Sequence, residues 1–228
     1  KVATANAAAA VDADPPLPKL LQAVKDGVKN PNKGECVVYW MRMADLRISD
    51  NRALSLASAQ AKEENIPLVV IFVISPQDYI AHDRGARRID FTLRNLFCVK
   101  DSLAKLPIPL HTFTEQTGEN YRRPVISFLQ DYSCNSFYAN IEYEVDELRR
   151  DLKVCALAKS KGMKAMFVHN KCIIEPGVVT TKANKAYAVY SPFERTWISK
   201  LNENQDSYLQ EYLAPEPNAS SIKKSKRF

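Results

Sequence analysis

The sequence predicts an α/β domain built on an open, five-stranded parallel sheet with helices on both faces. Short apolar runs of strand length alternate along the chain with longer segments whose apolar residues have helical spacing. One run, residues 67–74, is apolar at every position, which is typical of a parallel strand covered on both sides. Right-handed crossovers between such strands place helices on both faces of the sheet.

The expected elements follow in order. Strands are expected at residues 36–41, 67–74, 109–113, 136–141 and 164–169. Helices are expected at residues 19–28, after residue 50, and at about 85–105, 119–131 and 145–161. Asp50 is expected to cap the second of these helices by accepting a hydrogen bond from its first N–H groups. Small residues in that helix, among them Ala53 and Ala57, would let it lie close to the sheet.

Composition divides the chain into three parts. Residues 1–34 are expected to be a partly disordered leader, residues 35–203 the α/β domain, and residues 204–228 a linker. The final segment SIKKSKRF carries a charge of +4 out of the net +6, so the rest of the chain has a net charge of only +2. That charge does not indicate a broad basic surface that binds nucleic acid. This tail is either a nuclear-localisation-like patch or a solvated linker. No apolar run reaches the ~18 residues of a membrane span.

Standard nucleotide-binding and hydrolase motifs are missing. The six glycines form neither GxGxxG nor GxxxxGK[ST], and there is no GxSxG. His82, His111 and His169 lie in separate segments, so structural roles are expected and no catalytic residue is assigned. The five cysteines show no CxxC or Cys/His ligand spacing, which predicts reduced structural thiols and no metal site.

A polar loop, residues 42–50, follows the first expected strand. Ligands of parallel α/β sheets bind at the carboxyl ends of the strands, so this loop lies where such folds place function. Asp45 and Arg47 either form an ion pair that folds the loop or line a ligand pocket. Asp146 and Glu147, at the start of a later helix, either compensate the helix dipole or belong to a site.

Three motifs resemble signatures of the DNA photolyase/cryptochrome family, in the family's order. WMRMADLRISDNRAL at 40–54 resembles its opening signature, ANIEYEVDELRRD at 139–151 its second, and PGVVTTKANKAYAVYSPFERTW at 176–197 its third. Together they cover about residues 36–201. The segments NIEYEVDEL and CIIEPGVVTT are most similar to those of the eukaryotic, folate-using cyclobutane pyrimidine dimer photolyases.

The resemblance implies a Rossmann-like N-terminal domain that holds an antenna chromophore, either methenyl-tetrahydrofolate or a deazaflavin. In the family, a larger helical domain binds FAD and the DNA lesion, and its residues are absent from this chain. That helical domain is the expected partner, and UV-damaged DNA is expected to be reached only through it. The chain alone is expected neither to bind FAD well nor to repair DNA. The alternative is a stand-alone module for cryptochrome-type light sensing or scaffolding, without lyase activity.

The resemblance also implies a folate site. The family's Asn-Glu pair after the fourth strand matches Asp146 and Glu147, and Glu147 would accept hydrogen bonds from the pterin ring. Asp146 departs from the pattern, because a carboxylate cannot donate as an amide does. Four more residues are expected to border the cleft toward the missing domain: Met41, Arg42, Asp45 and Arg47. Arg47 is expected either to stabilise the interface with the missing domain or to stabilise the conformation of the loop through Asp45. The expected location is intracellular, in the nucleus, with the mitochondrion as the alternative.

Overall fold

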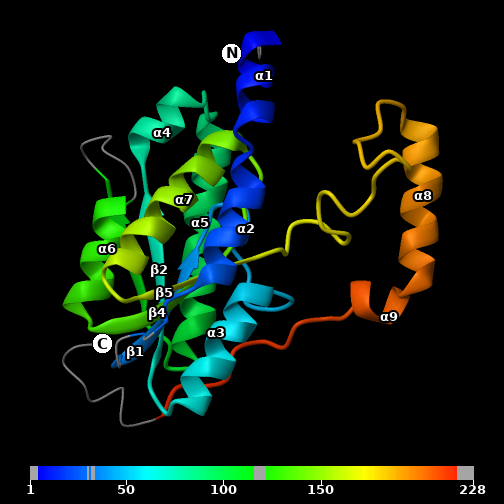
Figure 1. The fold of residues 1–228 in the computed structure, drawn as a ribbon. Helices are drawn as coiled ribbons and strands as arrows, with labels where there is room; N and C mark the ends of the chain where they lie inside the picture. The colour runs from blue at the N-terminus through cyan, green and yellow to red at the C-terminus, as the bar shows by residue number, and fades with distance from the viewer. Residues whose placement is uncertain (1–4, 30, 32–33, 116–121, 220–228) are drawn as a thin grey trace.

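The computed structural model describes residues 5–29, 31, 34–115 and 122–219. Its centre is a five-stranded sheet in the order β3-β2-β1-β4-β5, and all neighbouring strands are parallel (Figure 1). The strands are β1 (Cys36–Met41), β2 (Leu68–Ile74), β3 (Leu110–Thr114), β4 (Cys134–Asn140) and β5 (Lys164–Val168). The predicted open, parallel α/β sheet is confirmed.

Helices cover both faces of this sheet. One face carries α2 (Pro16–Asp26), α6 (Arg122–Asp131) and α7 (Val145–Ser160), packed around a core that includes Trp40 and Phe137. The other face carries α3 (Arg52–Glu63) and α5 (Ala86–Ala104), around a core that includes Tyr39 and Phe72. The remaining helices are α1 (Ala5–Ala13), α4 (Pro76–Ala81), α8 (Tyr190–Glu203) and α9 (Gln205–Tyr208). Within the described ranges, no helix combines the length and the apolar character needed to cross a membrane.

The central strand β1 marks the point at which the strand order reverses. From β1 the chain adds β2 and β3 on one side, then returns to add β4 and β5 on the other. Every residue of β1 is buried, and its side chains alternate between the two cores. The switch point therefore lies between the carboxyl ends of β1 and β4, where the polar loop 42–50 begins.

The cap of α3 differs from the prediction by one residue. Asn51, and not Asp50, has the extended backbone of an N-cap, and its Oδ1 accepts a hydrogen bond from the backbone N of Leu54 at 3.2 Å. Asp50 has a φ of 46°, in the left-handed region, so it does not occupy the N-cap position. It bonds the backbone of Tyr212 instead.

Two cysteines contradict the prediction of reduced thiols. Cys36 and Cys134 form a disulfide between the first residues of β1 and β4. These residues pair in the register of the two strands, which places their Cα atoms 5.1 Å apart, within the usual range for a disulfide. Cys98, Cys155 and Cys172 are free.

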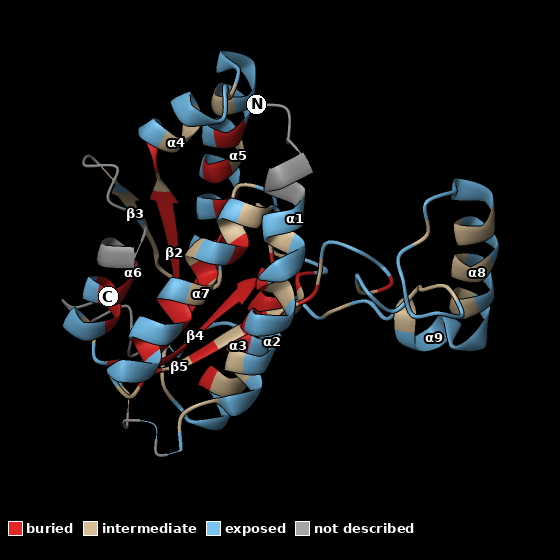
Figure 2. Cartoon of the chain, turned by 45° about the horizontal axis from the view of Figure 1, so that its top comes forward, coloured by how far each residue is buried: buried red, intermediate tan, exposed pale blue. Residues whose placement is uncertain are grey.

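Two segments near the end of the described chain lie outside the sheet. Residues 170–211, here called the arm, leave the α/β body and carry α8 and α9 (Figures 1 and 2). Residues 212–219, here called the strap, return along α3 in extended form. The backbone N of Glu216 donates to Ser58 Oγ at 2.9 Å, and the Asn218 side chain bonds both the N and the O of Leu68. The basic tail at 223–227 and the predicted start of a helix at 119 lie outside the described residues.

Candidate functional site

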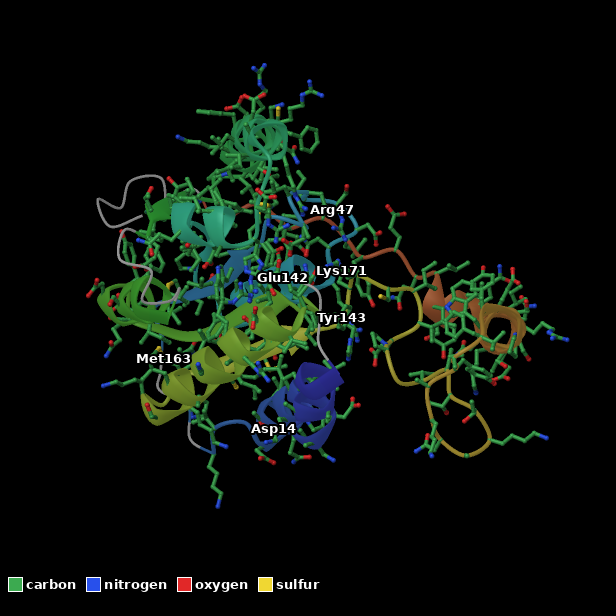
Figure 3. All side chains as sticks on the ribbon, turned by 90° about the horizontal axis from the view of Figure 1, so that it is seen from above. Asp14, Arg47, Glu142, Tyr143, Met163 and Lys171 are labelled. Atoms are coloured by element: carbon green, nitrogen blue, oxygen red, sulfur yellow. A yellow bond between two sulfur atoms is a disulfide. The ribbon has the colours of Figure 1, made fainter. Side chains whose placement is uncertain are left out.

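Two hollows open beside the carboxyl ends of β1 and β4. The first, here called the α4–α7 hollow, is bordered by Met41, Arg42, Tyr79, Glu142, Glu147 and Arg150 among others. The second, here called the loop hollow, has a volume of 220 Å³ and is bordered by Arg42, Asp45, Arg47, Asn140, Glu142 and Lys171 among others. Figure 3 shows Arg47, Glu142 and Lys171 close together when the molecule is seen from above.

Five of the six predicted site residues border these hollows. Met41 and Glu147 border the α4–α7 hollow, and Asp45 and Arg47 border the loop hollow. Arg42 borders both. Asp146 is exposed and borders neither, which leaves Glu147 as the member of the Asp-Glu pair that faces a hollow.

Arg42 and Glu142 border both hollows and belong to a cluster of four charged side chains, here called the charge cluster. It consists of Arg42, Glu142, Arg150 and Asp151. Arg42 is 4% exposed and donates to Glu142 Oε2 at 2.9 Å and to Asp151 Oδ2 at 3.3 Å. Arg150 donates to Glu142 Oε2 and to Asp151 Oδ1, both at 2.8 Å. Two positive and two negative groups therefore compensate one another away from water.

The charges of the cluster control its pKa values. Burial alone would raise the pKa of Glu142, but the adjacent Arg42 and Arg150 guanidiniums outweigh it and bring this pKa down to about 2. Burial alone would likewise lower the pKa of Arg150, and its two carboxylate partners raise it instead. Glu142 and Arg150 therefore both carry their charges at neutral pH. The hydrogen bonds of Arg42 to Glu142 and Asp151 connect the end of β1 to α7.

Trp40 forms the apolar floor under this cluster. It is 1% exposed, and the guanidinium carbon atoms of Arg42 and Arg150 lie 3.7 Å and 5.2 Å from its ring centroid. Two polar atoms at the α4–α7 hollow, Arg42 Nε and Glu147 Oε2, are buried and make no hydrogen bond within the described part of the chain. The hollow thus combines an aromatic floor with a carboxylate that has spare accepting capacity.

The polar loop is ordered by Asp45. Its carboxylate accepts hydrogen bonds from Tyr39 Oη at 2.7 Å, from the Arg42 backbone N at 2.6 Å and from Asn140 Nδ2 at 2.7 Å. Burial raises the pKa of Asp45, while the bonds from Tyr39 and Asn140 oppose that shift. Arg47 donates instead to the backbone O of Asp50 at 2.8 Å and 3.1 Å. No Asp45–Arg47 ion pair occurs among the described residues, so each folds the loop through a different partner.

Sequence reasoning missed several residues that build this site. The only sequence indication for Glu142 was its place directly after the predicted strand 136–141, two residues beyond the end of β4. Asp151 lies three residues after Leu148 and four before Cys155, so it belongs to the buried face of α7. A carboxylate on the buried face of a helix indicates a buried partner of opposite charge. Tyr39 and Asn140 stand inside predicted strands, and nothing local in the sequence connects them to Asp45.

The three histidines have different surroundings. His111, in β3, contacts the rings of Phe128 and Tyr132, and burial lowers its pKa. His169 Nδ1 is 2.7 Å from Tyr143 Oη, and burial lowers its pKa as well. His82 borders the α4–α7 hollow. Among the residues described, no group of three or more His, Cys, Asp or Glu side chains is placed to hold a metal ion.

Fold and site together define a doubly wound α/β domain with two hollows at its switch point and no glycine-rich phosphate loop in its sequence. The family model for DNA photolyase matches residues 37–216, and the chain belongs to that family. It corresponds to the family's N-terminal α/β domain, as the three signatures predict.

The relatives are much longer than this chain. The deoxyribodipyrimidine photo-lyase of Neurospora crassa is 39% identical over 193 residues, which cover 83% of this chain and 31% of that protein. The mitochondrial deoxyribodipyrimidine photo-lyase of Saccharomyces cerevisiae is 28% identical over 186 residues, which cover 75% of this chain and 33% of that protein. The chain therefore spans about a third of the length of these relatives.

Solved structures share the fold. A class III photolyase from Agrobacterium tumefaciens matches with a TM-score of 0.60 and 19% identity, over 88% of this chain and 40% of that one. A cryptochrome from Synechocystis sp. matches with a TM-score of 0.65 and 16% identity, over 80% of this chain and 37% of that one. At these identities the likeness supports the fold alone.

Proposed function

We propose that this chain is the antenna domain of a deoxyribodipyrimidine photolyase that acts in light-dependent DNA repair. The α4–α7 hollow, whose volume is about 50 Å³, would admit only part of a methenyl-tetrahydrofolate, such as an edge of its pterin ring. When bound, the folate absorbs light and passes the energy to an FAD in a further, helical domain. That domain would also contact UV-damaged DNA. The chain alone would neither bind FAD nor repair DNA.

The observation that supports this proposal is the Glu147 carboxylate. It borders the hollow from the first turn of α7, and its Oε2 is buried without a hydrogen-bond donor in the described structure. A buried polar atom without a partner costs ~1–3 kcal/mol. A small rotation of the carboxylate into the hollow would let it accept N–H groups of a pterin ring and remove that cost. Asp146 makes no such contribution, because it is exposed and lies outside the hollow.

The loop hollow is the second candidate position for a chromophore. It lies at the switch point of the sheet, where ligands of this fold class bind. Its volume is 220 Å³, and its lining carries three positive and two negative side chains, a net charge of +1 that suits a flat, anionic ring system such as a deazaflavin.

Exposed apolar side chains favour a domain of a longer protein over a stand-alone module. Ile80 on α4 is 80% exposed, and Phe91 and Phe97 on α5 are each 69% exposed. Tyr190 on α8 is 69% exposed, and Leu213 in the strap is 81% exposed. A module that evolved to work alone would carry polar residues at such positions, whereas a domain that docks on another keeps them apolar.

The test is retention of chromophore by the purified chain. The protein is mixed in turn with methenyl-tetrahydrofolate and with FAD, desalted, and examined by absorption spectroscopy. We expect folate to be retained and FAD to be lost. Glu147→Gln should weaken folate binding by roughly 10-fold or more, because a charge-assisted hydrogen bond contributes ~1.5–3 kcal/mol.

Glu144→Gln is the matched control, because Glu144 is an exposed acid at the same helix end that pairs with Lys171 at 2.9 Å. It should leave folate binding unchanged. Retention of FAD would contradict the proposed division between the two domains. Equal folate binding by wild type and Glu147→Gln would remove Glu147 from the site.

We also propose an intracellular, nuclear location. The yeast relative is named as mitochondrial, so import into that organelle is the alternative. Imaging of a fluorescently tagged chain in a fungal cell, with markers for both compartments, distinguishes the two.

A further inference from the structure

We propose that the solvent-facing side of α5, here called the α5 face, is a self-complementary surface on which a second copy of this chain docks antiparallel. Large apolar side chains stand on this face: Phe91 and Phe97 are each 69% exposed, and Leu93 is 37% exposed. The helix packs on the core with its opposite side, so these side chains take no part in the packing of the fold (Figure 2). Exposed apolar side chains gathered on one element are typical of an interface.

A row of charged side chains runs along the same face, between the two phenylalanines. Asp90, Arg94, Asp101 and Lys105 follow one another at intervals of four, seven and four residues, which places them along one line of the helix and its C-cap. All four are exposed, and Arg94 Nε lies 2.8 Å from Asp90 Oδ2. The signs of the charges therefore alternate along the row: negative, positive, negative, positive.

The order of these charges makes the α5 face complementary to itself when two copies run antiparallel. A twofold axis midway between Arg94 and Asp101 brings each of these residues opposite the other one in the second copy. The same axis brings Asp90 opposite Lys105, so the interface gains four pairs of opposite charge. A parallel arrangement would instead place each charge beside its own copy, where like charges repel. The charge pattern thus selects a second copy of this chain, in one orientation, as the occupant.

The centre of this interface is apolar. The axis passes between Phe97 and Cys98, so each Phe97 lies beside the same residue of the second copy and contributes the buried aromatic contact. Cys98, whose thiol is free and exposed, likewise comes close to its own counterpart. The geometry therefore predicts a contact between two thiols that is absent from the single chain.

The size of the α5 face predicts a weak dimer. A helix of 19 residues is ~28 Å long and ~10 Å wide, so the contact buries a few hundred Å² on each copy. Standard interfaces bury ~800 Å² on each partner, so we expect a dissociation constant on the order of 100 μM. No residue that borders the two hollows belongs to α5, and the exposed Ile80, Tyr190 and Leu213 lie on other elements. The inference is therefore independent of the proposed function.

The test is sedimentation equilibrium of the 228-residue chain at ~10–500 μM, a range that brackets the expected dissociation constant. We expect a reversible equilibrium between monomer and dimer. Arg94→Asp and Asp101→Arg should each weaken the dimer by about 5- to 30-fold, because each places like charges opposite one another and the twofold axis repeats the change. The double variant Arg94→Asp/Asp101→Arg restores opposite charges and should bind to within about threefold of the wild type.

Crosslinking through cysteine gives an independent measurement. A short bismaleimide should join two copies through Cys98, so Cys98→Ser should abolish the covalent dimer. Cys172→Ser is the matched control, because Cys172 is also free and exposed but lies outside α5, and it should leave the crosslink intact.

Two apolar positions separate a specific contact from general stickiness. Phe97→Ser should weaken the dimer by at least ~10-fold, as expected for an aromatic anchor. Ile80→Ser changes an exposed apolar side chain on α4 and should alter the affinity by less than about twofold. Both side chains are exposed, so both variants should keep the fold.

Three results would overturn the inference. A chain that stays monomeric at ~500 μM has no such interface. A dimer that tolerates either charge reversal, or that the double variant fails to restore, does not form through the charged row. A crosslink that depends on Cys172 and not on Cys98 places the contact on another surface. None of these results affects folate retention, which tests the proposed function separately.

Discussion

Asp151 is the position at which a single substitution should cost most. Its side chain is fully buried in α7 and accepts hydrogen bonds from Arg42 and Arg150. Asp151→Asn preserves the size of the side chain but removes one of the two negative charges in the charge cluster. The cluster is then left with an uncompensated guanidinium. Breaking a buried ion pair in this way costs ~3–5 kcal/mol, which is a large part of the ~5–15 kcal/mol that stabilises a typical domain.

The pH dependence gives a second measure of the same cluster. The pKa of Glu142 falls from its ordinary 4.5 to about 2 in the folded chain, which corresponds to a stabilisation of about 3 kcal/mol. Because the folded pKa is depressed, this stabilisation is fully present above the unfolded pKa of 4.5 and is lost as the pH falls toward 2. The free energy of unfolding should therefore decrease steeply in that window.

The assay is urea unfolding followed by circular dichroism at pH 7 and at pH 3. Asp146→Asn is the matched control, because it removes a charge from an exposed position on the same helix and should change stability by less than ~0.5 kcal/mol. The double variant Arg150→Gln/Asp151→Asn restores charge balance and should recover part of the loss. A loss below ~1 kcal/mol for Asp151→Asn at pH 7 would refute the view that these charges are desolvated and mutually compensated.

Three further predictions concern the strap, the cysteines and the α3 cap. Asn218 Nδ2 donates to the backbone O of Leu68 at 2.8 Å and of Pro107 at 3.0 Å. Asn218→Asp cannot donate these bonds, so we expect the free energy of unfolding to fall by ~1–3 kcal/mol and the backbone amide of Glu216 to exchange its hydrogen faster. Unchanged exchange at Glu216 would contradict the contact between the strap and the sheet. Alkylation of the unfolded protein should modify three cysteines without a reductant and all five after reduction. Modification of five cysteines without a reductant would contradict the Cys36–Cys134 disulfide. Asn51→Ala should lower the free energy of unfolding in urea by about 1–2 kcal/mol, and Asp50→Ala should lower it clearly less. The reverse order would indicate that Asp50 is the N-cap of α3.

The sheet was predictable because its signal is local. A strand that is buried on both faces needs an unbroken apolar run, and residues 36–41 satisfy that rule with the same bounds in sequence and structure. The start of β4 was placed two residues late, because Cys134 and Asn135 precede the apolar run that carried the prediction. Helices α1, α4, α8 and α9 were missed. α1 is a run of mostly alanine without a spaced set of larger apolar residues, and α4 and α9 have only six and four residues. α8 includes no buried residue, so no core contact imposes a burial pattern on it.

The site was predictable only as far as it follows from the ends of strands. Arg42 and Asp45 lie beside a hollow because the loop after β1 must lie at the carboxyl edge of the sheet, and their binding of a cofactor stays a prediction. Their actual partners were not predictable, since Arg42 pairs with Asp151, 109 residues away, and Asp45 with Asn140, 95 residues away. The same applies to the disulfide, whose cysteines are separated by 98 residues. Pairings of this range are decided by strand order, which local patterns do not encode.

The strap determines where the polypeptide beyond it begins its path. Asn218 is fixed to Leu68, the first residue of β2, so residue 219 lies at the amino edge of the sheet, while both hollows lie at the carboxyl edge. The two edges are separated by the length of a seven-residue strand, about 23 Å. In the two-domain protein proposed above, a domain that covered the hollows would be connected from the opposite edge of the sheet, and the connection would need at least ~7 extended residues to span that distance. Its docking would be an intramolecular association, whose effective concentration is highest when the length of the connection matches this span and falls as the connection is lengthened.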